Sequence, residues 1–362
     1  MANERDIVLE DIKEIISQLG NAIERLSGKT ILITGPSGLL AAYFVDMIAY
    51  VNDHKLIKEP AKIIGLTRSE IAPTDRLGYL LGRKDIAFEI HNVIEPYAPK
   101  EKIDFIIHVA GNSAPATFQS DPLGTIDVNV QGLRWILEYA RNNSVESVLY
   151  FSSGEIYGNP PPDQIPTPET FNGNVSPLSP RACYTESKRL CEALCKIYWE
   201  KFGVPVKIVR PFIVYGPGLR SDDRRVMADF MRAGIENVAI KMLSEGKDTR
   251  SYCYITDASV AFWRILFSDR NAEPFNVASD LEEVSIKELA EVVHKICGIE
   301  KAVEYPQEDK EVNFLKEAPQ RVRPDITKIR TLFHIEPKIF LEAGLKRNIN
   351  WNLLRLGKPT IE

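Results

Sequence analysis

The sequence predicts an α/β protein: a doubly wound parallel sheet of the Rossmann type, joined to a smaller C-terminal substrate-binding lobe. Over the first half of the chain, short apolar strands alternate with helices, as in parallel sheets covered on both faces. A glycine turn directly follows the first strand. A proline-rich loop over residues 160–180 separates the fifth strand from the next helix, and loops of that length are commonly functional.

The composition is that of a soluble globular protein of 362 residues, with 44% hydrophobic and 26% charged residues. The formal net charge of -5 gives no indication of nucleic-acid or anionic-membrane binding. No apolar run approaches the ~20 residues that span a bilayer. The N-terminus has no apolar signal-peptide core, and the five cysteines lack the spacing of a metal site or disulfide framework. We therefore expect a reduced, cytoplasmic protein without a metal.

Three parts are expected along the chain. Residues 1–27 form a helical extension, because isoleucines and leucines recur at helical spacing between charged residues. Residues 28–215 mainly form the dinucleotide-binding domain. Residues 216–362 mainly form the smaller lobe, which returns to the sheet around residues 275–277. Within it we expect helices over 222–236, 257–267 and 285–297.

The first strand, residues 30–34, runs into a turn that is suited to a pyrophosphate. Gly35 permits the tight turn, Gly38 lets the backbone approach the phosphates, and Ala41 allows close helix–strand packing. The following helix, through about residue 51, directs its N-terminal N–H groups at the same place. The expected cofactor-binding residues of the turn are Gly35, Ser37, Gly38 and Leu39.

The next strands are expected at residues 62–67, 86–91, 104–110, 147–152 and 206–210, with a helix over 122–143. After the second strand, Arg68 and Ser69 stand where an NAD site usually places a carboxylate for the ribose, which gives a slight preference for NADP. Asn92 follows the third strand. The fourth ends in Ala110, Gly111 and Asn112, where small residues leave room for a cofactor.

Tyr184 and Lys188 lie one turn apart on the same face of the next helix, expected through about residue 202. An ammonium group beside a phenol favours the phenolate and lowers the tyrosine pKa, which produces a general base. Ser153 follows the fifth strand and can hydrogen-bond a substrate hydroxyl that Tyr184 deprotonates while hydride leaves the same carbon. Lys188 would then hold the phenolate and bind the nicotinamide ribose.

With these features, the sequence from about Gly28 to Trp351 resembles the extended short-chain dehydrogenases/reductases, specifically the nucleotide-sugar epimerases, dehydratases and decarboxylases. Several stretches look most like UDP-glucuronate decarboxylases. They are residues 180–184 with Lys188 and Arg189, residues 249–257 and residues 319–325. The resemblance implies a tightly bound, regenerated NAD or NADP, a nucleotide-sugar substrate and a 4-keto intermediate. Loss of CO2 from a 4-keto uronic acid is easy because the carboxylate is β to the ketone.

The resemblance assigns further roles. Ser153, Tyr184 and Lys188 match the hydride-transfer residues, and Glu155 matches a glutamate that would act near C5. Arg250 is expected to approach the diphosphate with its guanidinium fork, and Arg323 to join the same anion site. Asn112 is expected at the substrate as well.

Some positions depart from the family patterns. Gly154 stands where dTDP-glucose 4,6-dehydratases carry an aspartate acid, and Ile213 where the family commonly has a substrate-binding asparagine. A 4-epimerase, which does not need Glu155, therefore remains the first alternative, and a 4,6-dehydratase the second. A non-catalytic dinucleotide-binding module is the alternative outside enzymes.

A homodimer is also expected, through the helix that bears Tyr184 and the helix around residues 134–139. Four side chains are candidates either for this interface or for ordinary core packing: Trp135, Leu137, Leu194 and Tyr198.

Overall fold

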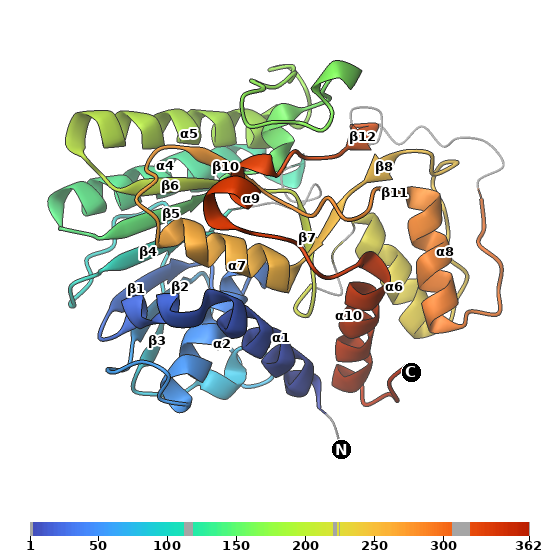
Figure 1. Ribbon diagram of the computed structural model, residues 1–362, viewed down its shortest axis with the longest axis horizontal. Helices are drawn as coiled ribbons and strands as arrows, with labels where there is room; N and C mark the ends of the chain where they lie inside the picture. The colour runs from blue at the N-terminus through green and yellow to red at the C-terminus, as the bar shows by residue number, and fades with distance from the viewer. Residues whose placement is uncertain (1–2, 112–118, 220–222, 224, 306–318, 362) are drawn as a thin grey trace.

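The computed structural model describes residues 3–111, 119–219, 223, 225–305 and 319–361, and its centre is a seven-stranded sheet (Figure 1). The strand order is β10-β6-β5-β4-β1-β2-β3, and every neighbouring pair is parallel. The strands are β1 (Thr30–Thr34), β2 (Lys62–Thr67), β3 (Ile86–Ile90), β4 (Phe105–His108), β5 (Ser147–Phe151), β6 (Val206–Pro211) and β10 (Pro274–Val277). The predicted fold class is confirmed.

Helices cover both faces of this sheet, which is why β1, β5 and β6 are buried along their whole length. One face packs against α2 (Leu39–Asp53) and α7 (Ile255–Leu266), and the other against α4 (Pro122–Asn142) and α5 (Ala182–Phe202). The strand order reverses between β1 and β4, and ligands of doubly wound sheets bind at the carboxyl ends of strands at such a point.

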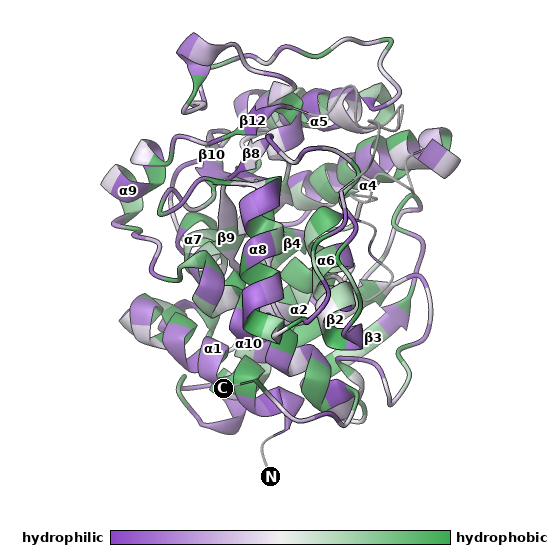
Figure 2. Cartoon of the chain, turned by 90° about the vertical axis from the view of Figure 1, so that its right-hand side faces the viewer, coloured by the Kyte–Doolittle hydropathy of each residue, from purple (hydrophilic) through white to green (hydrophobic). Residues whose placement is uncertain are grey.

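The chain beyond β6 builds the remaining elements around this sheet. Strands β7 (Ile213–Tyr215) and β9 (Tyr252–Tyr254) pair with each other, and β8 (Thr249–Arg250) lies between β11 (Val284–Ser285) and β12 (Arg321–Val322). The helices are α6 (Val226–Glu236), α8 (Ile286–Cys297), α9 (Thr327–Phe333) and α10 (Leu341–Arg355). Figure 2 shows the hydrophilic outer face of α8, whose apolar face packs on α6 and α10.

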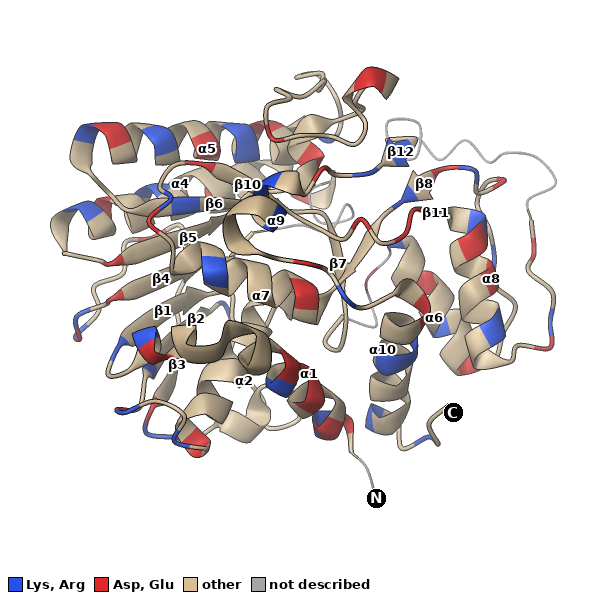
Figure 3. Cartoon of the chain, viewed as in Figure 1, with Lys and Arg blue, Asp and Glu red and all other residues tan. Residues whose placement is uncertain are grey.

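The N-terminal helix α1 (Glu4–Leu19), followed by a 3₁₀ helix over Gly20–Leu26, packs on α7, α10 and α2. Its first turn is acidic, as Figure 3 shows, and a capping box at Asn3 satisfies its free N–H groups. Ile12 and Ile15 are fully buried, so the extension belongs to the main core.

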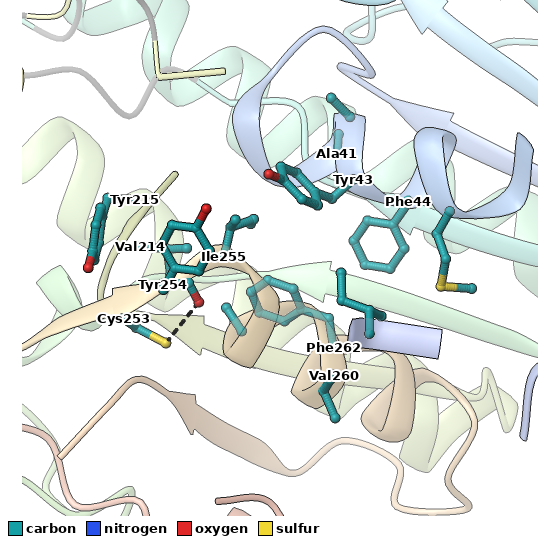
Figure 4. Close-up of a cluster of buried hydrophobic side chains, with 14 of the residues drawn as sticks. Ala41, Tyr43, Phe44, Val214, Tyr215, Cys253, Tyr254, Ile255, Val260 and Phe262 are labelled. Atoms are coloured by element: carbon teal, nitrogen blue, oxygen red, sulfur yellow. Dashed lines mark hydrogen bonds between the residues drawn. The ribbon is translucent and has the colours of Figure 1, made fainter. Parts of the chain in front are cut away.

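That core continues from α2 across α7 to the β7–β9 pair (Figure 4). Phe44 of α2 stacks on Phe262 of α7, with ring centroids 6.2 Å apart. Tyr215 of β7 meets Tyr254 of β9 edge-on at 5.4 Å. One hydrophobic core therefore extends from α2, which follows the glycine turn, to the C-terminal elements.

Two outcomes concern the predicted helices. Trp135, Leu137 and Tyr198 are buried between α4, α5 and the sheet, and Leu194 is partly buried against them, so these side chains serve core packing. The expected helix start at residue 222 lies outside the described residues, and α6 begins at Val226. Helices α9 and α10 and the short sheets were not predicted.

Candidate active site

The turn after β1 has the geometry of a phosphate-binding turn. Gly35 has φ of +67°, and a Cβ there would lie 3.3 Å from the Cα of Ala110 at the end of β4. Helix α2 begins at Leu39 with Gly38 as its N-cap, and no side chain caps it. Ser37 and Gly38 are exposed. The turn therefore fits a dinucleotide pyrophosphate, because its first helical N–H groups point toward the crevice without a side-chain partner.

The other predicted cofactor residues lie at the same edge of the sheet. Arg68 follows β2 and Asn92 follows β3, and both are exposed. A Cβ on Gly111, just past β4, would approach the Oδ1 of Asn129 at 3.0 Å and the Nζ of Lys188 at 3.5 Å. A glycine there leaves the space beside Lys188 open, which suits a bound nicotinamide ribose. Asn112 lies outside the described residues.

Ser153 and Tyr184 are brought into contact by β5 and α5. Ser153 precedes a short 3₁₀ helix over Gly154–Tyr157, and its Oγ accepts the N–H of Glu155 at 3.1 Å. Tyr184 lies in the first turn of α5, is buried, and shares a hydrogen bond with Ser153. The serine hydroxyl and the phenol thus meet at one point, as hydride chemistry at a carbinol carbon requires.

Lys188 is buried one turn further along α5. Its Nζ donates to the carbonyl oxygen of Phe151 at 2.8 Å and lies 5.8 Å from the centroid of the Tyr184 ring. Burial lowers the pKa of Lys188 to about 8, because the charged form loses its hydration.

The expectation that the protein by itself lowers the pKa of Tyr184 is wrong. Burial raises this pKa to about 12, although the hydrogen bond from Ser153 opposes the rise, and Glu155 raises it further. The physical reason is that Lys188 is itself buried and hydrogen-bonded to Phe151, so its charge does not offset the loss of hydration around the phenol.

Glu155 lies at this site and forms an ion pair with Arg181, the residue just before α5. The sequence reasoning missed Arg181 as a functional residue. The available signal was its position three residues before Tyr184, because residues three apart near the start of a helix lie on the same face.

A buried polar network fixes the backbone behind Ser153. Glu192 of α5 accepts hydrogen bonds from Ser152 at 2.5 Å and from Arg210 of β6 at 2.9 and 2.6 Å. Arg210 also donates to the hydroxyl of Tyr157 at 2.6 Å, and Tyr157 donates to Asn276 of β10 at 2.7 Å. These bonds join the ends of β5, β6 and β10 to α5, so they hold in place the segment from Ser152 to Tyr157 that carries Ser153.

The two predicted anion-binding arginines lie near each other, because Arg250 of β8 pairs in register with Val322 of β12 and Arg323 directly follows β12. The Arg250 guanidinium donates to the carbonyl oxygens of Thr249 and Gln320 at 2.8 and 3.1 Å. Arg323 pairs with Glu283 at 3.0 Å. Arg321, and then Thr249 and Arg323, hold the pKa of Glu283 at about 2, so this carboxylate stays ionised and neutralises part of the cationic surface.

Asn129 of α4 is a second residue that sequence reasoning missed. Its Nδ2 donates to the hydroxyl of Ser187 at 2.8 Å, while its Oδ1 is buried without a hydrogen-bond partner among the described residues. Such an acceptor beside Lys188 indicates a position for a water molecule or ligand group. No sequence signal distinguishes Asn129 from other polar helix residues.

Two other classes of site were sought in the described part of the chain. It contains no group of three or more His, Cys, Asp or Glu side chains placed to hold a metal ion. None of its helices is both long and apolar enough to cross a membrane.

Comparison with known proteins relates this geometry to characterised enzymes. The model of the NAD dependent epimerase/dehydratase family matches residues 31–278. UDP-glucuronic acid decarboxylase 6 of Arabidopsis thaliana is 30% identical over 343 residues, 95% of this chain and 94% of its own. UDP-glucuronic acid decarboxylase 1 of Xenopus tropicalis is 28% identical over 326 residues, 89% of this chain and 72% of its own.

Solved structures share the fold at lower identity. UDP-glucose 4-epimerase of Thermotoga maritima has a TM-score of 0.76 at 21% identity, covering 90% of this chain and 99% of its own. UDP-glucuronic acid 4-epimerase of Bacillus cereus, solved with UDP-glucuronic acid and NAD, has a TM-score of 0.71 at 20% identity, covering 89% and 98%. The family match over residues 31–278 and the 30% identical relative show that the chain belongs to the NAD dependent epimerase/dehydratase family of enzymes.

Proposed function

We propose that the protein is a redox-neutral nucleotide-sugar decarboxylase that acts on UDP-glucuronate. One observation carries the choice: Glu155 lies at the site of Ser153 and Tyr184. Its backbone N–H donates to the Oγ of Ser153, and its carboxylate pairs with Arg181. Hydride transfer at C4 needs a serine, a tyrosine and a lysine, whereas a carboxylate beside them is useful for a step at C5. The decarboxylase relatives, about 30% identical over most of the chain, support the same choice.

In this proposal, a nicotinamide cofactor held at the glycine turn of Gly35 and Gly38 and beside Lys188 would supply a reversible hydride acceptor for C4. Tyr184 accepts the proton of the C4 hydroxyl while Ser153 hydrogen-bonds the same oxygen. Because burial alone keeps the phenol protonated, the phenolate would form when the positive charge of a bound oxidised nicotinamide adds to that of Lys188. The C5–C6 bond then breaks, CO2 leaves, and its electron pair is delocalised onto the C4 ketone oxygen. Glu155 relays a proton from solvent to C5, where a C–H bond replaces the broken C5–C6 bond. Arg250 with Arg323 offers positive charge to the diphosphate.

A 4-epimerase is the second candidate, because several solved neighbours carry that name and the Ser153, Tyr184 and Lys188 set suits it equally. A 4,6-dehydratase is disfavoured because position 154 has no room for the aspartate side chain that such enzymes carry. A Cβ at Gly154, where dehydratases carry their aspartate, would lie 2.8 Å from the ring of Phe212, and that ring stacks on Tyr157 at 5.8 Å. A regulatory module without catalysis is disfavoured because the relatives named above are enzymes.

NAD is the cofactor that the family description and the neighbours solved with NAD support. The exposed Arg68 after β2 supports a slight preference for NADP, since a guanidinium group pairs well with a 2′-phosphate. We propose that residues 28–215 mainly bind the cofactor and that residues 216–362 mainly bind the nucleotide sugar. Residues 1–27 form a helical extension.

We also propose a homodimer in a reducing, cytoplasmic compartment. Leu190 and Ile197 lie two turns apart on one face of helix α5 and are about half exposed, which suits contact with a second copy. The buried cysteines Cys191 and Cys195 are free thiols, as is usual in reduced compartments.

Product mass tests the function directly. The purified protein is incubated separately with UDP-glucuronate, UDP-glucose, GDP-mannose and CDP-glucose, and the products are weighed by mass spectrometry. Loss of CO2 from UDP-glucuronate is expected. An unchanged mass with a new sugar configuration would replace decarboxylation by epimerisation, and loss of water would replace it by dehydration. The nucleotide released on denaturation identifies the cofactor as NAD or NADP.

Replacing Glu155 by Gln separates the two leading candidates. For a decarboxylase, we expect CO2 release to fall by ~10²–10⁴, the usual contribution of a positioned acid–base group. The variant keeps the shape of the side chain and removes only its charge. Glu186→Gln, a half-exposed glutamate of α5, is the matched control and should keep full activity. Unchanged turnover of the Glu155 variant would argue for epimerisation.

A further inference from the structure

The reaction above assigns no task to two arginines that act on Tyr184, Arg181 and Arg225, and of these Arg181 pairs with Glu155. Its side chain is 11% exposed, against 38% for Glu155, so the guanidinium is the more enclosed member of the ion pair. Its carbonyl oxygen accepts the N–H groups of Tyr184 at 3.0 Å and Thr185 at 3.2 Å. The first turn of α5 therefore fixes the backbone from which Arg181 extends.

Glu155 and Arg181 have opposite effects on the charged state of their neighbours. Glu155 raises the pKa of Tyr184 and Arg181 lowers it. The same two residues act in opposite directions on the pKa of Arg250. Glu155 and Arg181 are in direct contact, so the guanidinium of Arg181 offsets the charge of Glu155 beside Tyr184.

An acidic sugar makes this offset necessary. A uronic acid brings its own carboxylate to C5, next to the position proposed for Glu155. Two carboxylates that share a site repel each other, so either one of them becomes protonated or the sugar binds poorly. A guanidinium can pair with carboxylates through five N–H donors in a fixed planar fork, so one arginine can serve two anions.

We propose that Arg181 is a positioning residue that makes this site selective for nucleotide-linked uronic acids. It holds Glu155 in place and offsets its charge, so that the carboxylate of the sugar can enter beside it. The proposal rests on the function proposed above and adds to it the residue that selects an acidic over a neutral sugar. A neutral hexose has no second carboxylate and does not need Arg181.

Binding measurements with two ligands test this. Calorimetry on the intact protein compares UDP-glucuronate with UDP-glucose, which differ in the C6 carboxylate. For Arg181→Gln, we expect the Kd of UDP-glucuronate to rise at least tenfold and that of UDP-glucose to change less than twofold. Arg181→Lys should recover part of the loss. Arg270→Gln, which removes an exposed arginine paired with Glu273, is the matched control and should change neither.

A double variant distinguishes charge compensation from a structural role. In Glu155→Gln with Arg181→Gln, no uncompensated carboxylate faces the sugar, so UDP-glucuronate binding should return to within about threefold of wild type although CO2 release stays low. A protein damaged at the start of α5 would not be rescued by a second substitution.

Specific outcomes overturn the inference. Charge compensation would be refuted if Arg181→Gln weakened the binding of both ligands equally or left the affinity for UDP-glucuronate unchanged. It would also be refuted if the double variant failed to recover binding of UDP-glucuronate. The function itself is judged separately. If wild-type protein binds UDP-glucuronate through Arg181 as described and releases no CO2, the decarboxylase proposal fails and the selectivity rule stands.

Discussion

Asp11 in α1 is a buried carboxylate at which the N-terminal extension meets three other parts of the fold. It accepts hydrogen bonds from Tyr43 of α2 at 2.7 Å, from Tyr254 of β9 at 3.0 Å and from Arg347 of α10 at 3.0 Å. Glu14 pairs with the same arginine. Burial raises the pKa of Asp11 to about 6, although Tyr43 and Arg347 act in the opposite direction.

This shift sets how the stability should depend on pH. The folded protein holds the proton of Asp11 more tightly than the unfolded chain, where the pKa is 3.8. Stability from this group is therefore greatest below pH 4 and is lost as the pH rises through 6. A rise of about 2 pKa units corresponds to about 3 kcal/mol in the free energy of unfolding.

Asp11→Asn removes the titration and keeps the shape of the side chain. Urea unfolding of wild type and variant between pH 4.5 and 7.5 measures the difference in the free energy of unfolding. We expect this difference to move in favour of the variant by about 2 kcal/mol between pH 4.5 and 7.5, because part of the shift lies below pH 4.5. Glu10→Gln, exposed on the same helix, is the matched control and should show no such trend. A pH-independent difference, or one that moves in favour of wild type at neutral pH, would refute the reasoning.

Two further predictions concern catalysis and assembly. Tyr184→Phe removes the hydroxyl that hydrogen-bonds Ser153, so we expect turnover to fall by ~10²–10⁴ while nucleotide-sugar binding is retained. Turnover rate and Kd measured together check this, and a loss of binding alone would contradict it. Ile197→Glu places a charge in the exposed apolar surface of α5 and should convert a dimer to a monomer in sedimentation; an unchanged dimer would place the interface elsewhere.

The sequence by itself determined the sheet and most of the proposed site. Strands alternate with helices at spacings that only a parallel sheet satisfies, and the glycine turn marks the first crossover. Ser153 and Tyr184 were predicted to meet because strand ends and following helices converge at one edge of such a sheet. These inferences depend on local periodicity and on known topology, so they needed no coordinates.

Only the tertiary structure decided how the charges are paired. The contacts between Glu155 and Arg181, between Arg323 and Glu283, and between Asp11 and Arg347 join residues up to 336 positions apart. The elevated pKa of Tyr184 likewise follows from burial. Sequence spacing carries no information on such long-range contacts or on the loss of hydration, because both arise only when the chain has packed.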